Sequence, residues 1–175
     1  MKTKTVVGAA VVGLAAAGVL YASPYLALRS IGKAIDNKDT DAVSEYVDFP
    51  ALRESIKGQM LVKIQRDLQA PEMKDNPFAG FGQALAMGML NQAVETLVSP
   101  AGVMLMLENG KPGKPADVAA AGMGVDTHGG ERRKDFVVRY QGWSKVFVHP
   151  KGEEGGFVFK RDGLMGWKLV AVKMD

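Results

Sequence analysis

The sequence predicts an α+β protein: an N-terminal transmembrane or signal helix, then several amphipathic helices packed on a C-terminal four-stranded antiparallel meander. Three observations predict this order. Residues 5–22 carry no charged side chain. Residues 23–108 repeat apolar side chains at the three- and four-residue spacing of helices, and residues 135–174 change to the two-residue alternation of strands. Short turns between the strands favour an antiparallel sheet that the helices cover on one face.

Residues 1–22 are expected to form a membrane anchor or signal segment. As a helix, the uncharged run would reach ~27 Å, which is close to the hydrocarbon thickness of a bilayer. Lys2 and Lys4 precede the run, so the positive-inside rule keeps the N-terminus in the cytoplasm and exports the rest. Cleavage after Ala22 would place Leu20 where a signal peptidase needs a small residue. Cleavage earlier in the run stays open, but we expect an uncleaved anchor.

Residues 23–108 are expected to form the helical part of a single domain. Proline and capping residues predict where its helices begin. The predicted helices start at Ser23-Pro24, at Asp39 or Thr40, at Asp48-Phe49-Pro50 (ending near Gln69), near Phe81 (ending at Val98) and at Ser99-Pro100 (ending at Asn109-Gly110). Apolar side chains at intervals of four, such as Leu52, Ile56 and Met60, would face the sheet.

The C-terminal part changes character twice. Residues 109–134 are expected to be a flexible linker loop, because they are rich in Gly, Pro and Ala. Residues 135–175 are expected to form the antiparallel sheet of the same domain. Its four predicted strands are Asp135–Tyr140, Trp143–His149, Gly156–Arg161 and Trp167–Met174.

The composition excludes several classes of function. The chain has no cysteine and two histidines, His128 and His149, so disulfides, thiolate sites and three-histidine metal sites are excluded. Neither histidine has a carboxylate at a recognisable ligand spacing, and no nucleotide-binding motif is complete. The net charge is only +3, which does not indicate nucleic-acid binding. We therefore expect no catalytic, cofactor-binding or metal-binding residues, and no cofactor.

Asp48 is the one acid that suggests an enzymatic alternative. It lies between Val47 and Phe49, where apolar neighbours could raise its pKa. In that alternative, a small enzyme of the cone-fold type would use Asp48 with Tyr46 or Tyr140 for proton transfer. The structural interpretation is stronger: an acid directly before Phe-Pro is an N-cap of the following helix. The tyrosines are first of all expected to be core aromatics.

Residues 23–108 and 135–175 resemble a known family. The string SPYLALRSIGKAIDNKDTDAVSEYVDFPALRESIKGQM, above all YVDFP at 46–50, is similar to an uncharacterised family of bacterial envelope proteins, a domain of unknown function. The resemblance implies an N-terminal membrane anchor or signal and an extracytoplasmic domain, and it implies no activity. The order of helices and strands also resembles the cystatin-like and nuclear-transport-factor-like cone folds.

These observations predict a non-enzymatic, membrane-tethered envelope module that binds a partner protein or an apolar ligand in the concavity of its sheet. We expect the inner membrane, with a single pass and the domain on the periplasmic side, or the periplasm if the leader is cleaved. Met87, Met89, Met104 and Met106 could form a soft groove for such a ligand, although core filling explains them as well.

A structural dimer through the anchor helix is a further alternative. Ala9, Gly13 and Ala17 recur every four residues, and such a stripe of small side chains lets two membrane helices approach closely. An Ala- and Gly-rich leader also produces this spacing by chance. A homodimer therefore stays a possible partner interaction beside the membrane and the unknown envelope ligand.

Overall fold

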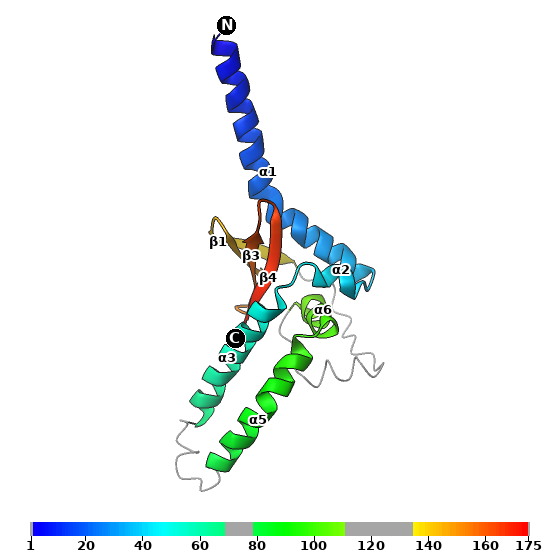
Figure 1. Ribbon diagram of the computed structural model, residues 1–175, viewed down its shortest axis with the longest axis vertical. Helices are drawn as coiled ribbons and strands as arrows, with labels where there is room; N and C mark the ends of the chain where they lie inside the picture. The colour runs from blue at the N-terminus through cyan, green and yellow to red at the C-terminus, as the bar shows by residue number, and fades with distance from the viewer. Residues whose placement is uncertain (1, 69–78, 111–134, 175) are drawn as a thin grey trace.

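The computed structural model describes residues 2–68, 79–110 and 135–174, and these residues form the expected α+β fold (Figure 1). The predicted linker residues 111–134 lie outside the described residues. The helices are α1 (Lys2–Asp36), α2 (Thr40–Ser44), α3 (Phe49–Leu68), α5 (Ala79–Leu97) and α6 (Pro100–Asn109). The strands are β1 (Phe136–Gly142), β2 (Lys145–Pro150), β3 (Gly156–Asp162) and β4 (Gly166–Lys173).

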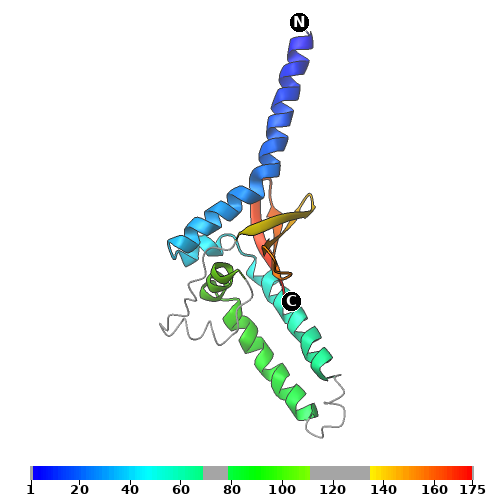
Figure 2. The same cartoon turned by 180° about the vertical axis from the view of Figure 1, so that it is seen from behind.

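The four strands form an antiparallel meander in the order β1-β2-β3-β4, as predicted. The residues of β2, β3 and β4 that point to the inner face are buried, because this face of the sheet packs against helices. The buried residues on that inner face include Val146, Val148, Phe157, Phe159, Trp167 and Leu169. The C-terminal half of α1, with α2 and α6, lies on one side of the sheet (Figures 1 and 2).

The predicted helix start at Ser23-Pro24 is wrong, because α1 continues through Pro24 and bends there (Figure 1). Pro24 has no N–H to donate to the Leu20 carbonyl one turn earlier. Two other donors replace it: the Ser23 hydroxyl at 2.8 Å and Arg161 Nη2 at 3.2 Å. The Ser23 hydroxyl also accepts a hydrogen bond of 2.9 Å from Trp167 Nε1. Tertiary contacts therefore satisfy the carbonyl that the proline leaves unpaired.

The free edge of β4 is covered by the segment that leads into α3. Leu169 makes a parallel bridge with Val47. Its N–H donates to the Tyr46 carbonyl at 2.7 Å, and its carbonyl accepts from the Asp48 N–H at 2.9 Å. Further along β4, the Gln59 side-chain amide donates a hydrogen bond to the Val172 carbonyl, and its oxygen accepts a hydrogen bond of 2.9 Å from the Met174 N–H. These bonds satisfy backbone groups that an open edge strand would offer to another chain.

Helices α3 and α5 lie side by side and extend away from the sheet, at the opposite end of the molecule from the start of α1 (Figures 1 and 2). Near the sheet they bury apolar side chains, including Leu52, Ile56, Leu90, Val94 and Leu97. Arg53 and Glu95 join the two helices by an ion pair of 3.1 Å. Further out, Val62, Leu85 and Met89 are exposed. The core therefore lies between the sheet and the near ends of the helices.

Candidate functional site

A cavity of about 740 Å³ lies between α1, α6 and the inner face of the sheet. The apolar stripe of α1 and the inward residues of β2 and β3 supply its walls, because both sets face the same layer. The apolar side chains around it are Leu28, Ile31, Ile35, Leu107, Phe136, Val148, Phe157 and Phe159. Ile31, Val148, Phe157 and Phe159 are buried core residues, while Phe136 is partly exposed. The cavity is thus an extension of the hydrophobic core that opens to the surface.

Charged side chains complete the lining of this cavity. Arg29 and Lys33 come from the outer turns of α1, and Lys38 follows its C-terminus. The carboxylates of Asp36 and Glu108 also line it. Lys38 has a left-handed backbone (φ 54°), and its N–H bonds the Ile35 carbonyl at 3.0 Å as the helix ends. Three cations and two carboxylates therefore surround an otherwise apolar space.

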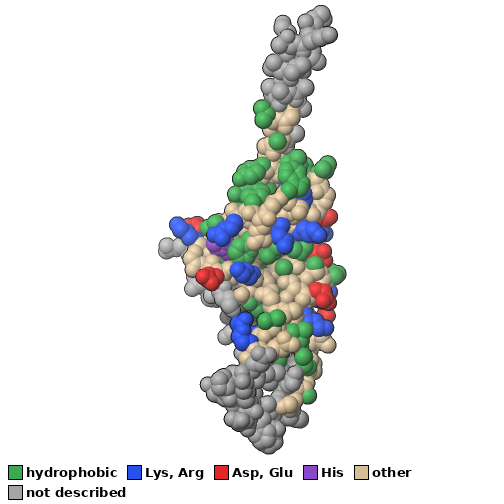
Figure 3. All heavy atoms as spheres, turned by 90° about the vertical axis from the view of Figure 1, so that its left-hand side faces the viewer, with side chains coloured by type: hydrophobic (Ala, Val, Ile, Leu, Met, Phe, Trp, Pro, Cys, Tyr) green, Lys and Arg blue, Asp and Glu red, His purple; other side chains and the backbone are tan. Residues whose placement is uncertain are grey.

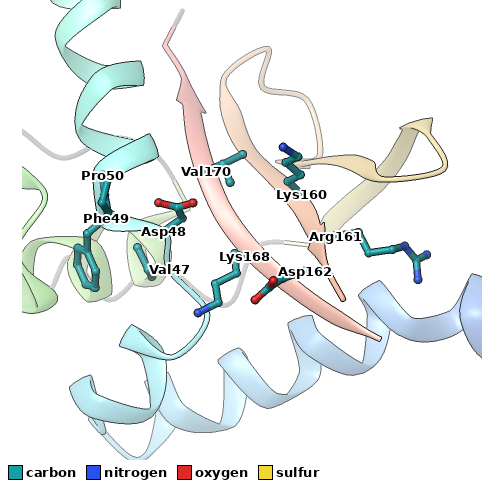
Figure 4. A pocket seen from close by; sticks show the side chains of 9 residues that line it. All are labelled: Val47, Asp48, Phe49, Pro50, Lys160, Arg161, Asp162, Lys168 and Val170. Atoms are coloured by element: carbon teal, nitrogen blue, oxygen red, sulfur yellow. The ribbon is translucent and has the colours of Figure 1, made fainter. Parts of the chain in front are cut away.

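A second hollow, of about 450 Å³, lies at the start of α3 on the outer face of the sheet (Figure 4). Asp48 lines it, together with Lys160, Asp162 and Lys168. The Asp48 carboxylate accepts a hydrogen bond of 3.0 Å from the Ala51 N–H, so it caps α3. The N-cap interpretation is confirmed. This hollow is polar, and Arg161 also lines it, with its side chain extended away from Asp48 (Figure 4).

The structure does not bring Asp48 together with Tyr46 or Tyr140. Neither tyrosine is among the described residues that line the Asp48 hollow. Tyr46 is half-buried and packs against the core. Tyr140 donates its hydroxyl hydrogen to the Tyr21 carbonyl, and its ring stacks on the Tyr21 ring with centroids 4.8 Å apart. The proton-transfer group proposed for the enzymatic alternative is therefore not assembled in the described part of the chain.

The environment of Tyr140 raises the pKa of its hydroxyl above the ordinary value. Desolvation by burial is the main cause, and the neighbouring Tyr25 and Tyr21 add to it. Arg161 acts in the opposite direction because its positive charge favours the tyrosinate. Tyr140 thus stays protonated and keeps its hydrogen bond to α1.

His149, in the described residues, is not part of a cluster that could hold a metal ion. His149 Nδ1 faces the carbonyls of Pro150 and Glu153 at 3.0 and 3.1 Å, so this nitrogen carries the proton. Its Nε2 is buried, with no hydrogen-bond partner in the structure. His128 lies outside the described residues. Within residues 2–68, 79–110 and 135–174, no group of three or more His, Asp or Glu side chains is placed to hold a metal ion.

The methionines do not share one surface. Met106 is fully buried and Met104 packs against the core, whereas Met87 and Met89 are exposed on α5. Core filling, the interpretation favoured from the sequence, therefore explains the two methionines of α6, and the four methionines do not form the alternative common groove. The small-residue stripe is described only in part: Gly13 and Ala17 are exposed, and the side chain of Ala9 lies outside the described residues.

Sequence reasoning missed Arg161, which organises the junction between α1 and the sheet. Its guanidinium lies between the rings of Trp143 and Trp167, 4.8 and 4.7 Å from their centroids. It donates to the carbonyls of Leu20, Trp143 and Leu164 at 3.2, 3.3 and 2.5 Å. The sequence held one signal for this junction: Trp143 and Trp167 each follow a predicted hairpin turn closely.

Comparison with known proteins gives one match. The family described as "Protein of unknown function (DUF2939)" matches residues 14–106, more than half of the chain. The chain belongs to this family. The DUF2939 match begins within α1, ends within α6 and leaves out the sheet. No curated protein and no solved structure matches the chain, so the bacterial envelope setting and the likeness to cone folds stay predictions.

One helix in the described residues is long and apolar enough to cross a membrane. This stretch, Gly13–Asp36 of α1, lies near the N-terminus and is mostly exposed. A signal sequence in this place has the same properties. The prediction of an N-terminal apolar helix is therefore confirmed, in the form of a possible membrane span or signal.

Proposed function

We propose that this member of the DUF2939 family is a membrane-tethered binding module that holds an apolar ligand, with an acyl chain and an anionic head, in the cavity between α1 and the sheet. The observation that carries the proposal is the cavity of about 740 Å³ lined mainly by aliphatic and aromatic side chains. Its volume is within the range of about 300–1,000 Å³ for small-molecule sites.

The wall chemistry favours an aliphatic chain. Phe157 and Phe159 on β3 line the cavity together with Leu28 and Ile31 on α1, and all four belong to the hydrophobic core or pack against it. Each methylene group that leaves water for such a space contributes about 0.8 kcal/mol. An apolar chain of several carbons would gain enough free energy there to offset the ordering that binding requires.

The charges around the cavity favour an anionic head group. Arg29, Lys33 and Lys38 provide three positive charges, and Asp36 and Glu108 provide two negative ones. The surplus is one cation at the edge of an apolar space, where a carboxylate or phosphate gains more from it than in bulk water. A neutral or cationic ligand would not use this surplus.

The tether supplies the source of such a ligand. Helix α1 contains a stretch, Gly13–Asp36, that is long enough and apolar enough to span a bilayer, and the N-terminal half of the helix extends away from the domain (Figure 1). With Lys2 and Lys4 on the cytoplasmic side, the domain and its cavity would stand on the periplasmic face of the inner membrane. The cavity would then stand close to a reservoir of acyl chains.

Photocrosslinking of the full chain in lipid nanodiscs tests this proposal. A fatty acid with a diazirine in its chain is added, irradiated, and located by peptide mass spectrometry. We expect crosslinks on the cavity-lining parts of α1, α6 and β3. Crosslinks confined to residues 5–22, with none on the cavity walls, would show that the probe meets the protein only in the bilayer.

Two tryptophan variants make the test specific. Leu28→Trp places a larger side chain in the cavity wall and is expected to abolish the crosslinks on β3. Leu85→Trp makes the same replacement on the exposed surface of α5 and should leave them unchanged. Equal crosslinking in both variants would contradict binding in the cavity.

A further inference from the structure

Hydrogen bonds from one residue, Arg161, join two hairpin turns to the bend in α1. Arg161 donates to Leu20 of α1, to Trp143 in the β1–β2 turn and to Leu164 in the β3–β4 turn. The backbone N–H of Arg161 also donates a hydrogen bond of 2.8 Å to the Ser144 carbonyl. The two turns therefore keep a defined position beside the point where the apolar helix leaves the domain.

The side chains around this junction are apolar and exposed. We call them the aromatic rim. Its members are Tyr21 and Tyr25 on α1, Trp143 in the β1–β2 turn, and Leu164 and Met165 in the β3–β4 turn. Leu164 is 79% exposed, Trp143 70% and Tyr21 64%. Figure 3 shows hydrophobic side chains gathered on the surface of the domain next to α1. A concentration of this kind on one surface marks an interaction site.

A row of lysines lies directly behind the two turns. Lys145 of β2 pairs in register with Lys160 of β3, which pairs with Lys168 of β4. Paired residues of neighbouring strands point to the same face of a sheet, so these three lysines lie side by side across β2, β3 and β4. Like charges placed opposite each other on neighbouring strands destabilise the sheet unless an anionic partner binds them. Asp48 and Asp162 share the hollow with Lys160 and Lys168 (Figure 4), and Asp48 is already engaged in capping α3.

We propose that the aromatic rim inserts into the interfacial layer of the bilayer that holds α1, and that the lysine row contacts anionic lipid headgroups. This inference rests on the membrane tether of the proposed function. Trp and Tyr are the side chains that favour this layer, because their rings are apolar and their N–H and O–H groups are polar. The partner is thus a lipid surface, continuous with the span.

The spacing of the two features fits the layer structure of a membrane. Lys160 and Lys168 are each two residues from the ends of their turn, Asp162 and Gly166. At ~3.3 Å per residue this is about 7 Å. The headgroup region on each side of the hydrocarbon core is about 5–8 Å thick. A turn that reaches the edge of the hydrocarbon would therefore place the lysines among the phosphates.

Site-specific labelling of the full chain tests the insertion, and the natural chain has no cysteine to interfere. Three single-cysteine variants each carry one environment-sensitive fluorophore: Leu164→Cys, Leu14→Cys and Val62→Cys. They are reconstituted in vesicles of phosphatidylcholine and phosphatidylglycerol that contain nitroxide lipids as quenchers. All three positions are exposed, on the rim, on the N-terminal half of α1 and on α3. We expect quenching at 14 and 164 and none at 62.

The outcomes separate this inference from the tether on which it depends. Quenching at 14 with none at 164 would mean that the span is correct and the docking is wrong. No quenching at 14 would mean that α1 is not embedded, so that the tether fails and the docking fails with it.

Charge variants test the lysine row separately. Replacing Lys145, Lys160 and Lys168 by Gln should lower the ratio of quenched to unquenched label at position 164 by about five-fold for each lysine. Replacing Lys57, Lys63 and Arg66 on α3 by Gln removes the same charge elsewhere and should leave the ratio unchanged. Equal effects of the two triple variants, or no loss when phosphatidylglycerol is omitted, would overturn the headgroup contact.

Discussion

Replacing Ser23 by alanine tests the junction that holds α1 on the sheet. Ser23 and Trp167 are each only 2% exposed, and the Trp167 Nε1–H donates to the Ser23 hydroxyl at 2.9 Å. In Ser23→Ala this indole N–H has no acceptor, and a buried unpaired donor costs about 1–3 kcal/mol. The Leu20 carbonyl keeps its bond from Arg161. The better helix propensity of alanine returns about 0.5 kcal/mol.

The net loss is about 1.5 kcal/mol, which lowers the unfolding temperature of a chain of this size by about 3–6 °C. Thermal unfolding of the full chain in nanodiscs, followed by tryptophan fluorescence, measures this change. Ser30→Ala is the matched control, because Ser30 is exposed on the same helix. It should change the unfolding temperature by no more than its small gain in helix propensity.

A double-mutant cycle identifies the cause of the loss. In a Trp167→Phe background the unpaired N–H does not exist, so Ser23→Ala should cost clearly less than it does in the natural chain. If Ser23→Ala unfolds at the same temperature as Ser30→Ala, or costs the same in both backgrounds, the hydrogen bond to Trp167 does not stabilise the bend.

Three further predictions concern other parts of the fold. Because the folded-state pKa of Tyr140 is raised above 10.0, the stability that its protonated form contributes is complete below the unfolded pKa and is lost as the pH rises through the folded pKa. Tyr140→Phe should remove one step above pH 10.0 from an absorbance titration of the tyrosines, and an unchanged titration would contradict this. Gln59→Ala breaks two hydrogen bonds to the edge of β4 and should cost about 2 kcal/mol in thermal unfolding, whereas exposed Gln65→Ala on the same helix should cost little. Lys38→Gly relieves a left-handed backbone and should raise stability by about 0.5–1 kcal/mol; a lower unfolding temperature would show that Lys38 is not strained.

Much of the fold could be predicted, because capping and periodicity act over a few residues. The predicted starts of α2, α3 and α6 are confirmed by the side chains of Asp39, Asp48 and Ser99, each of which accepts a hydrogen bond from the first turn. The four strands are confirmed within a few residues of their predicted ends. Leu28 and Ile31, which line the cavity, have the helical spacing that was predicted for residues 23–108.

The wrong prediction of a helix start at Ser23-Pro24 has a physical reason. Ser23-Pro24 is compatible with either a helix start or a bend inside a helix, and the choice depends on donors that replace the lost backbone bond. One donor, the Ser23 hydroxyl, is local, but the other is Arg161 of β3, which is 141 positions from Leu20. Trp167 of β4, which donates to the Ser23 hydroxyl, is 144 positions from Ser23. No local pattern reports contacts of that separation.

The amino-acid sequence by itself determined the order of helices and strands, the apolar N-terminal helix and the exclusion of cysteine chemistry, because each depends on composition or on neighbours within one or two turns. Only the tertiary structure decided that α1 continues through Pro24, that the tyrosines stand apart from Asp48, and that Lys145, Lys160 and Lys168 form one row. Strand register aligns residues that are distant in sequence, so the cavity and the lysine row on which the two proposals rest arise only when the sheet forms against α1.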